Sequence, residues 1–154
     1  MKIVPATEGD IDEIVAIERL SFARPWSRYA FKQELRSPFS YLFCIKVQEE
    51  DGERVAGYVG LWLIKEEAHI TNIAVHPKYR RRGFARRLLE FVEQISLERG
   101  ATLLTLEVRR SNQPAINMYR KKGFQITGVR KGYYFEDRED ALIMTLYLSP
   151  QAVG

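Results

Sequence analysis

A strongly amphipathic segment between two strand-like runs narrows the fold class. Its apolar residues recur at helical spacing and a glycine follows at position 100, which together predict a helix over 84–97. Runs rich in β-branched and aromatic residues flank this helix at 68–75 and 102–108. Strands that alternate with helices in this way indicate an α/β fold in which helices cover a mixed sheet.

The remaining segments predict a sheet that is mostly antiparallel. Strand-like runs at 41–48, 54–65 and 68–75 are separated by charged turns, which favours an antiparallel meander. The other predicted strands are 2–6, 124–134 and 141–148, and the other predicted helices run from 11 to 22, from Ser27 to about Pro38 and from Asn112 to Gly123. In total we expect about seven strands and about four helices in one domain over residues 1–154.

The composition is that of a protein that folds by itself. Of the 154 residues, 45% are hydrophobic and 29% are charged, which excludes a disordered tail and a small disulfide-dependent protein. The sequence lacks a run of about 20 apolar residues, so a membrane span is not expected. The first ten residues include Glu8 and Asp10, which argues against a secretion signal and favours a cytoplasmic location.

Cysteine and histidine are too few for a disulfide or a structural metal site. The chain has one cysteine, Cys44, and two histidines, His69 and His76. Cys44 lies in an apolar run and is expected to be a small buried residue. We expect both histidines to be structural and no metal to be bound.

An arginine-rich turn precedes the strongest predicted helix. Residues 78–87 contain six cations and no acid, and Gly83 and Ala85 allow a close approach to the backbone. The first N–H groups of a helix lack partners within the helix and carry partial positive charge, so the turn suits a phosphate group. A solvated basic surface and a patch that binds nucleic acid through its phosphates are the alternatives.

Several motifs follow one another in the order typical of one enzyme superfamily. The residues Asn72-Ile73-Ala74-Val75, the Arg-x-x-Gly-x-Ala turn at 80–85, Leu106-Glu107-Val108-Arg109 and the segment 111–119 resemble the GNAT superfamily of acetyl-CoA-dependent N-acetyltransferases. Pro25-Trp26-Ser27, Gly132-Tyr133-Tyr134 and Arg138-Glu139-Asp140-Ala141 resemble more narrowly the bacterial ribosomal-protein alanine N-acetyltransferases and the archaeal N-terminal acetyltransferases. The similarity spans nearly the whole chain.

The resemblance implies a GNAT fold with acetyl-CoA as cosubstrate and no metal. In this family the sheet splays open between two central strands, where one strand pairs with the pantetheine arm and the glycine turn holds the pyrophosphate. The coenzyme-binding residues implied here are Ile73, Ala74, Val75, Arg81, Arg82, Gly83, Phe84, Ala85, Arg86, Asn112 and Tyr119. Ala85 stands where the family accepts glycine or alanine.

The resemblance also implies the catalytic residues and the acceptor site. Glu107 corresponds to the proposed general base and Tyr119 to the proposed general acid. The residues that flank the acceptor peptide would be Pro25, Trp26, Tyr29, Tyr133 and Tyr134, with Glu136 beside them.

Each of these residues also has a purely structural interpretation. Glu107 can pair with Arg109 or an exposed neighbour at a strand end. Tyr119 follows Ile116 on one helical face, which is typical of a core tyrosine whose hydroxyl meets water. Asn112 is a natural helix cap, a role compatible with coenzyme contact. The aromatic residues of the acceptor segments can belong to the core and to turns.

The chemistry favours an α-amine as the acceptor. An α-amine has a pKa near 8, so neutralising it at pH 7 costs only about 1 to 1.5 kcal/mol, whereas a lysine side chain costs roughly 4.5 kcal/mol. One carboxylate working through water therefore suits a protein N-terminus better than a lysine. A phenol with a pKa of about 10 can stabilise or protonate the departing thiolate.

We therefore expect an enzyme that transfers acetyl from acetyl-CoA directly to the N-terminal α-amine of a protein, with a ribosomal protein beginning with alanine as one candidate. The first alternative is a GNAT enzyme that acts on a small amine or on a lysine side chain. The second is a noncatalytic basic domain that binds nucleic acid, which the arginine run suggests. Neither a membrane nor a nucleic acid is required by the favoured interpretation.

Overall fold

A computed structural model describes residues 1–148, and the last six residues of the domain predicted over 1–154 lie outside that range. The strands are β1 (Lys2–Pro5), β2 (Ser40–Glu49), β3 (Gly52–Ile64), β4 (Glu67–Val75), β5 (Leu103–Arg109), β6 (Gln125–Arg130) and β7 (Ala141–Tyr147). The helices are α1 (Ile11–Ser21), α2 (Arg28–Arg36), α3 (Phe84–Glu98) and α4 (Gln113–Lys121), with short 3-10 helices η1 (Glu8–Asp10) and η2 (Pro77–Tyr79). The predicted α/β class and the predicted sets of strands and helices are confirmed.

Local side-chain hydrogen bonds explain where the first two helices begin. The Asp10 carboxylate accepts hydrogen bonds from the N–H and the hydroxyl of Thr7, at 2.9 and 3.2 Å, and leads the chain through η1 into α1. It also pairs with Lys46 of β2 at 2.8 Å, which ties the start of α1 to the sheet. At α2 the Ser27 hydroxyl accepts a hydrogen bond from the Ala30 N–H at 3.1 Å. Caps of this kind contribute about 1 kcal/mol each.

The predicted meander is present, because β2 pairs with β3 and β3 with β4, both antiparallel. The register of β3 and β4 shifts after Gly60, which leaves Thr71 as an extra residue in β4. A glycine is needed at position 60, since a Cβ atom there would lie 2.4 Å from the Thr71 hydroxyl and 2.6 Å from the Asn72 side-chain oxygen. The bulge therefore depends on this glycine.

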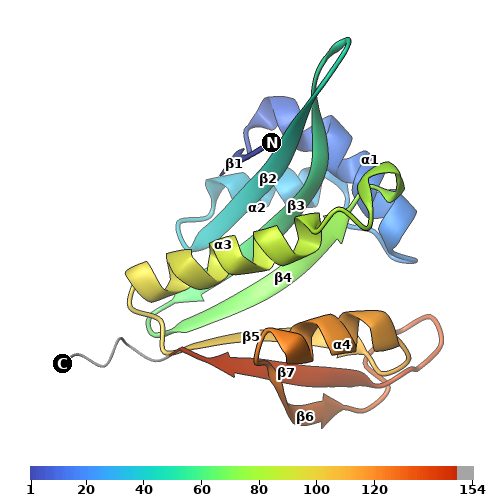
Figure 1. The fold of residues 1–154 in the computed structure, drawn as a ribbon. Helices are drawn as coiled ribbons and strands as arrows, with labels where there is room; N and C mark the ends of the chain where they lie inside the picture. The colour runs from blue at the N-terminus through green and yellow to red at the C-terminus, as the bar shows by residue number, and fades with distance from the viewer. Residues whose placement is uncertain (149–154) are drawn as a thin grey trace.

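The seven strands form one sheet in the order β1-β2-β3-β4-β5-β7-β6. The pair β4–β5 is parallel and short, and it joins Glu67–His69 to Leu103–Thr105. Beyond His69 and Thr105 the two strands diverge, as Figure 1 shows. The predicted mixed sheet that opens between two central strands is thus confirmed, and we call the divergent part of β4 and β5 the seam.

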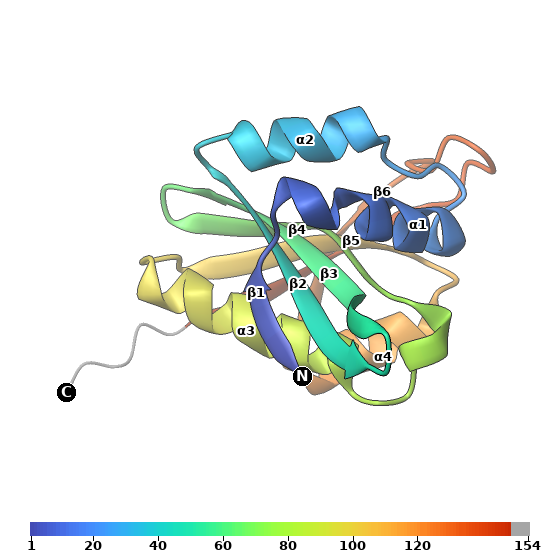
Figure 2. The same ribbon diagram turned by 90° about the horizontal axis from the view of Figure 1, so that it is seen from above.

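Helices cover both faces of the sheet, and Figure 2 shows α1 and α2 on one side and α3 and α4 on the other. The core under α3 and α4 is the larger one and includes Leu88, Leu89, Val92, Leu104 and Leu106. The core under α1 and α2 includes Ile14, Ile17, Phe31 and Tyr58, all nearly inaccessible to solvent. We call the side with α1 and α2 the acceptor face.

The strand predicted over 124–134 is shorter than expected, since β6 ends at Arg130. Gly132 has a φ of +59°, a left-handed conformation that ends strand pairing, and its N–H donates a hydrogen bond to the Asp140 carboxylate at 2.9 Å. Residues 131–140 instead form a loop between β6 and β7, which we call the β6–β7 loop. In residues 1–148 we find no helix that is both long and apolar enough to cross a membrane.

Candidate active site

The arginine-rich turn ends in an open helix terminus. Gly83 is the N-cap of α3 with a φ of +77°, and Arg81 before it is also left-handed with a φ of +65°. Gly83 has no side chain with which to cap the helix, so the first N–H groups, including those of Phe84, Ala85 and Arg86, are available to an outside acceptor. A Cβ atom built at Gly83 meets no atom within 4 Å, so the space in front of the turn is open. This geometry fits a diphosphate group.

The cations around the turn are exposed and only partly paired. The Arg80 side chain donates a hydrogen bond to the Val75 carbonyl at 3.3 Å, and Arg86 pairs with Glu90 at 3.3 Å. The Arg82 guanidinium lies 5.4 Å from the centre of the Tyr79 ring. The turn is therefore positively charged on the side where its N–H groups are open, which favours an anionic ligand.

The end of β4 offers a free strand edge to the seam. Residues 73–75 pair with β3 on one side, while β5 is no longer paired with β4 on the other. Their backbone groups on the seam side can therefore pair with an extended ligand, as an additional strand would. The structure thus brings the predicted pantetheine-binding residues Ile73, Ala74 and Val75 and the glycine turn into one continuous stretch of chain that runs from the seam to α3.

Asn112 is the N-cap of α4, and its side-chain oxygen accepts a hydrogen bond from the Ala115 N–H at 3.3 Å. The structural interpretation of Asn112 is therefore confirmed. Its contact with a coenzyme stays a prediction.

Glu107 lies on β5 at the mouth of the seam, on the acceptor face. One carboxylate oxygen is 3.3 Å from His69 Nε2 and the other is 3.2 Å from Arg130 Nε, and the side chain is 16% exposed. The hydrogen bond with His69 lowers the pKa of Glu107; burial opposes this shift and Arg130 supports it. Glu107 is thus a charged carboxylate that remains open to solvent, as a base acting through water requires.

His69 is a member of the site that sequence reasoning missed. It was expected to be structural, but its Nε2 faces Glu107 and its Nδ1 is 2.7 Å from the Thr105 hydroxyl. Trp62 of β3 packs on its other side, with ring centres 6.1 Å apart. The contact follows from the parallel register that places His69 opposite Thr105, two residues before Glu107, and no local pattern in the sequence shows that register.

Arg109 does not pair with Glu107, so that half of the structural interpretation is wrong. The other half is confirmed, because Glu107 pairs with Arg130, an exposed residue at the end of β6. Although the two residues are close in β5, the Arg109 guanidinium turns to acidic residues of the β6–β7 loop. Glu107 pairs instead with the histidine and arginine of two other strands.

Tyr119 packs on the opposite face of the sheet, in α4. It is 6% exposed, and its ring lies 5.7 Å from that of Phe124. Burial raises its pKa to about 12, so the hydroxyl keeps its proton at neutral pH and can donate a hydrogen bond. The core interpretation of Tyr119 is therefore confirmed for its ring, and its role as an acid stays a prediction.

A buried carboxylate, Glu18, anchors the segment between α1 and α2. It is 2% exposed and accepts hydrogen bonds from the Trp26 N–H at 2.9 Å, from the Asn72 amide at 3.2 Å and from the Tyr58 hydroxyl. The sequence holds a signal for this residue, because position 18 lies four residues after Ile14 and so continues the buried stripe of α1. Glu18 fixes the 22–27 segment to β3 and to β4 beside the seam.

The predicted acceptor residues differ in their surroundings. Trp26 is half-buried against Phe31, with ring centres 5.3 Å apart, so it belongs partly to the core. Pro25 and Tyr29 are exposed, as is Tyr133 of the β6–β7 loop, whereas its neighbour Tyr134 is half-buried.

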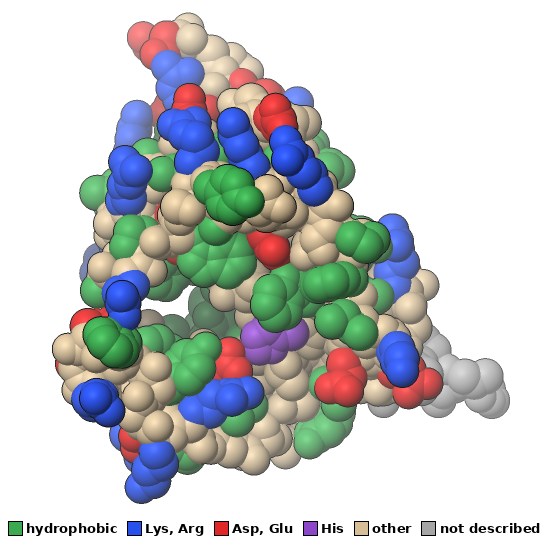
Figure 3. Space-filling model, turned by 180° about the vertical axis from the view of Figure 1, so that it is seen from behind, with side chains coloured by type: hydrophobic (Ala, Val, Ile, Leu, Met, Phe, Trp, Pro, Cys, Tyr) green, Lys and Arg blue, Asp and Glu red, His purple; other side chains and the backbone are tan. Residues whose placement is uncertain are grey.

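The two segments that carry the predicted acceptor residues meet over the acceptor face. The Arg24 guanidinium lies 4.6 Å from the centre of the Phe135 ring, which joins the α1–α2 segment to the β6–β7 loop. Figure 3 shows this side of the molecule, where the surface is hollowed and hydrophobic, acidic, basic and histidine side chains gather around the hollow.

Two further predictions concern the cysteine and metal ligands. Cys44 is fully buried, as expected, and burial raises the pKa of its thiol to about 12, so it is not a nucleophile. Among residues 1–148 no group of three or more His, Cys, Asp or Glu side chains is arranged to hold a metal ion.

Comparison with known proteins agrees with this geometry. The profile of the Acetyltransferase (GNAT) family matches residues 11–124. A Bacillus subtilis protein with the provisional name ribosomal protein bS18-alanine N-acetyltransferase is 43% identical over 136 residues, which cover 88% of this chain and 87% of the relative. An N-alpha-acetyltransferase of Saccharolobus solfataricus is 35% identical and covers 90% of this chain and 88% of its own length.

A solved structure shows the same fold at significant sequence identity. The crystal structure of the ribosomal-protein-S18-alanine N-acetyltransferase from Escherichia coli superposes with a TM-score of 0.86 and 34% identity, covering 96% of this chain and 94% of that chain. The family profile, these relatives and the common fold together show that the protein belongs to the GNAT family of acetyltransferases.

Proposed function

We propose that this enzyme transfers acetyl from acetyl-CoA directly to the N-terminal α-amine of a protein, with a ribosomal protein beginning with alanine as the first candidate. The observation that carries the proposal is the position of Glu107, a solvent-accessible carboxylate at the point where β4 and β5 part. The names of the bacterial and archaeal relatives support a protein N-terminus as the acceptor.

The residues present fit acetyl-CoA. The free edge of Ile73, Ala74 and Val75 suits the amide groups of a pantetheine arm, and the open N–H groups after Gly83 suit its diphosphate. Arg81, Arg82 and Arg86 add positive charge at the same end. When bound, acetyl-CoA supplies the acetyl thioester that the amine attacks.

The chain's own groups then divide the chemistry between the two faces of the sheet. On the acceptor face Glu107, held by His69 and Arg130, accepts a proton from the incoming ammonium group through water. On the other face Tyr119 keeps its proton and can donate a hydrogen bond toward the sulfur that departs. The amine would reach the thioester in the seam from the acceptor face and attack it directly, without a covalent enzyme intermediate.

Mass spectrometry of small peptides tests the acceptor. We expect one acetyl group to be added to peptides with a free N-terminal alanine, including one copied from the bS18 protein that the relatives' names give. Peptides with a blocked N-terminus and an internal lysine should stay unmodified. Acetylation of the blocked peptides would show that the acceptor is a lysine side chain. Acetylation of small amines alone would show that the acceptor is a small molecule.

A further inference from the structure

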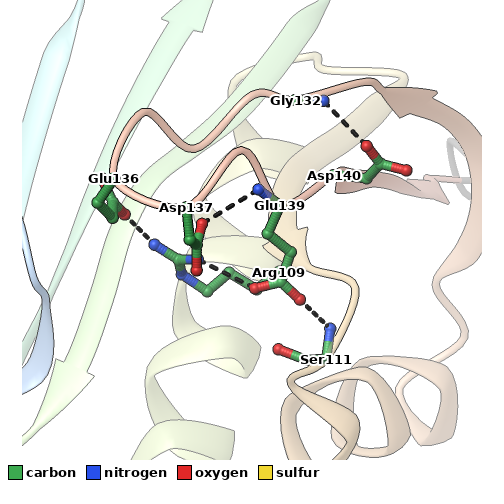
Figure 4. Close-up of polar contacts among 7 residues, drawn as sticks. All are labelled: Arg109, Ser111, Gly132, Glu136, Asp137, Glu139 and Asp140. Carbon is green, nitrogen blue, oxygen red and sulfur yellow. Dashed lines mark hydrogen bonds and ion pairs between the residues drawn. The ribbon is translucent and has the colours of Figure 1, made fainter.

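The last residue of β5, Arg109, contacts four residues of one loop. Its Nη1 lies 2.9 Å from a carboxylate oxygen of Asp137 and 3.0 Å from one of Glu139, and its Nη2 contacts Glu136. Its guanidinium carbon also lies 4.0 Å from the centre of the Tyr134 ring. Figure 4 shows Glu136, Asp137 and Glu139 turned toward this one arginine, while Asp140 contacts the Gly132 N–H.

Further hydrogen bonds continue from the same cluster to the backbone after β5. The second carboxylate oxygen of Glu139 accepts a hydrogen bond from the Ser111 N–H at 2.7 Å, and the Arg110 N–H donates to the Asp140 carbonyl at 3.1 Å. The Glu139 N–H in turn donates to the Asp137 carboxylate at 3.1 Å. The loop is therefore fixed to the end of β5 by side-chain contacts in addition to the backbone pairing at its base.

Charge explains why this loop needs the arginine. Glu136, Asp137 and Glu139 place three negative charges within four residues, and like charges this close repel one another. A planar guanidinium can satisfy several carboxylates at once and can also stack on an aromatic ring, which a lysine ammonium does less well. Arg109 therefore offsets the repulsion among the three carboxylates, because all three contact its guanidinium group.

The same contact places an aromatic side chain near the reaction centre. Arg109 is two residues beyond Glu107, so both side chains lie on the acceptor face. Tyr134, stacked against Arg109, is half-buried, and burial raises its pKa to about 12 although the charge of Arg109 opposes the shift. Its hydroxyl therefore stays protonated at neutral pH. Its neighbour Tyr133 lies against Arg130, 5.8 Å from ring centre to guanidinium carbon, and Arg130 pairs with Glu107.

We propose that Arg109 is a positioning residue for the acceptor: it holds the β6–β7 loop over the end of β5 and thereby sets Tyr133 and Tyr134 beside Glu107. It touches neither the coenzyme turn nor the free edge of β4, so it acts on acceptor binding and not on coenzyme binding. This inference rests on the proposed function only for the identity of the acceptor, since the fixing of the loop can be measured without catalysis.

Two variants of Arg109 and one of its neighbour test the inference. Arg109→Gln removes the charge, and Arg109→Lys keeps the charge but loses the planar guanidinium that contacts several carboxylates at once. Arg110→Gln is the matched control, because Arg110 is 55% exposed and faces a single carboxylate at 3.6 Å. We expect hydrogen exchange of the 131–140 amides to become about tenfold faster in Arg109→Gln, to change less in Arg109→Lys and to stay within about twofold in the control.

Kinetics give the second measurement. In Arg109→Gln the KM for an acceptor peptide should rise about tenfold while the KM for acetyl-CoA stays within about twofold. Added salt should raise the peptide KM of the unaltered enzyme by screening the loop contacts, and this salt effect should be smaller in Arg109→Gln. If Arg109→Gln does not fold, the inference is tested by hydrogen exchange and the peptide KM of Arg109→Lys and by the salt dependence of the unaltered enzyme.

The two proposals fail in different ways. Unchanged hydrogen exchange in the loop of Arg109→Gln, or an equal rise of both KM values, would overturn the role of Arg109. If the unaltered enzyme acetylates no peptide N-terminus, the proposed function fails, and the hydrogen-exchange result still decides whether Arg109 fixes the loop.

Discussion

Glu107 is held in its charged form by two partners, His69 and Arg130. Because its pKa lies below the ordinary value of 4.5, it stays ionised throughout the range in which an α-amine titrates near pH 8. The loss of activity below pH 8 should therefore follow protonation of the acceptor amine and not of Glu107.

Replacing this carboxylate should change the pH dependence as well as the rate. We expect Glu107→Gln to lower kcat/KM about 10² to 10⁴-fold at pH 7 and by less at pH 9, where most of the amine is already neutral. Glu67→Gln is the control, because Glu67 is an exposed residue of the neighbouring strand β4. Parallel pH–rate profiles of Glu107→Gln and the unaltered enzyme would remove Glu107 from the role of base.

Tyr58→Phe isolates one contact of the buried Glu18 carboxylate. Tyr58 is fully buried, and burial together with the adjacent Glu18 raises its pKa, so its hydroxyl remains a donor. Removing that hydroxyl leaves the carboxylate short of one donor and should lower the free energy of unfolding by about 1–3 kcal/mol. Tyr29→Phe, at a side chain that is 71% exposed, should change it by less than about 0.5 kcal/mol. Urea unfolding of the two variants measures the difference, and equal stabilities would contradict this account.

At the scale of one element, α3 offers two glycines for a matched comparison. Gly83 before the helix and Gly100 after it have φ values of +77° and +85°, and a Cβ atom at either position meets no atom within 4 Å. Alanine at either position should therefore cost a similar strain of about 1–2 kcal/mol in stability.

Only the variant at the start of α3 should affect the coenzyme. Calorimetric titration should show weaker acetyl-CoA binding in Gly83→Ala, because the added methyl group enters the space that a diphosphate would occupy, and unchanged binding in Gly100→Ala. Equal affinities in the two variants would show that the turn does not approach the coenzyme closely.

The sequence predicted elements best where a local rule determines them. The helix at 84–97 follows from apolar periodicity, and the predicted start at Ser27 agrees with the cap that this residue provides for α2. The strand predicted over 124–134 ran too far, because the ion pairs of Arg109 with acids of the β6–β7 loop, which lie 27 to 30 positions further along the chain, help to hold residues 131–140 in a loop. Such contacts leave no periodic pattern in the sequence.

Some residues of the candidate site can be predicted from the sequence, and others cannot. The glycine turn and Glu107 stand out as sequence motifs, and Glu18 continues the buried stripe of Ile14, whereas the place of His69 depends on the pairing of distant strands. A histidine opposite Thr105 depends on the register of a parallel pair whose strands are separated in the chain by α3, so no local pattern shows it.

At the scale of the whole molecule, binding in the seam should stabilise the fold. A ligand that binds only the folded state at 100 times its dissociation constant adds about 2.7 kcal/mol to the free energy of unfolding. We therefore expect acetyl-CoA to raise the Tm, and we expect an RNA oligonucleotide at the same concentration to leave it unchanged. Stabilisation by RNA that disappears with salt, and none by acetyl-CoA, would favour a basic nucleic-acid-binding domain instead.

The short parallel pair also orders the folding of the chain. The hairpins β2–β3 and β3–β4 close over turns at 50–51 and 65–66, whereas the contact of His69 with Thr105 spans 36 positions and must wait for α3 to pack. During synthesis the first four strands can pair while β5 is still within the ribosome. We therefore expect the join beside the seam to form after the meander, so a molecule halted before this step would have a formed meander and no place for either substrate.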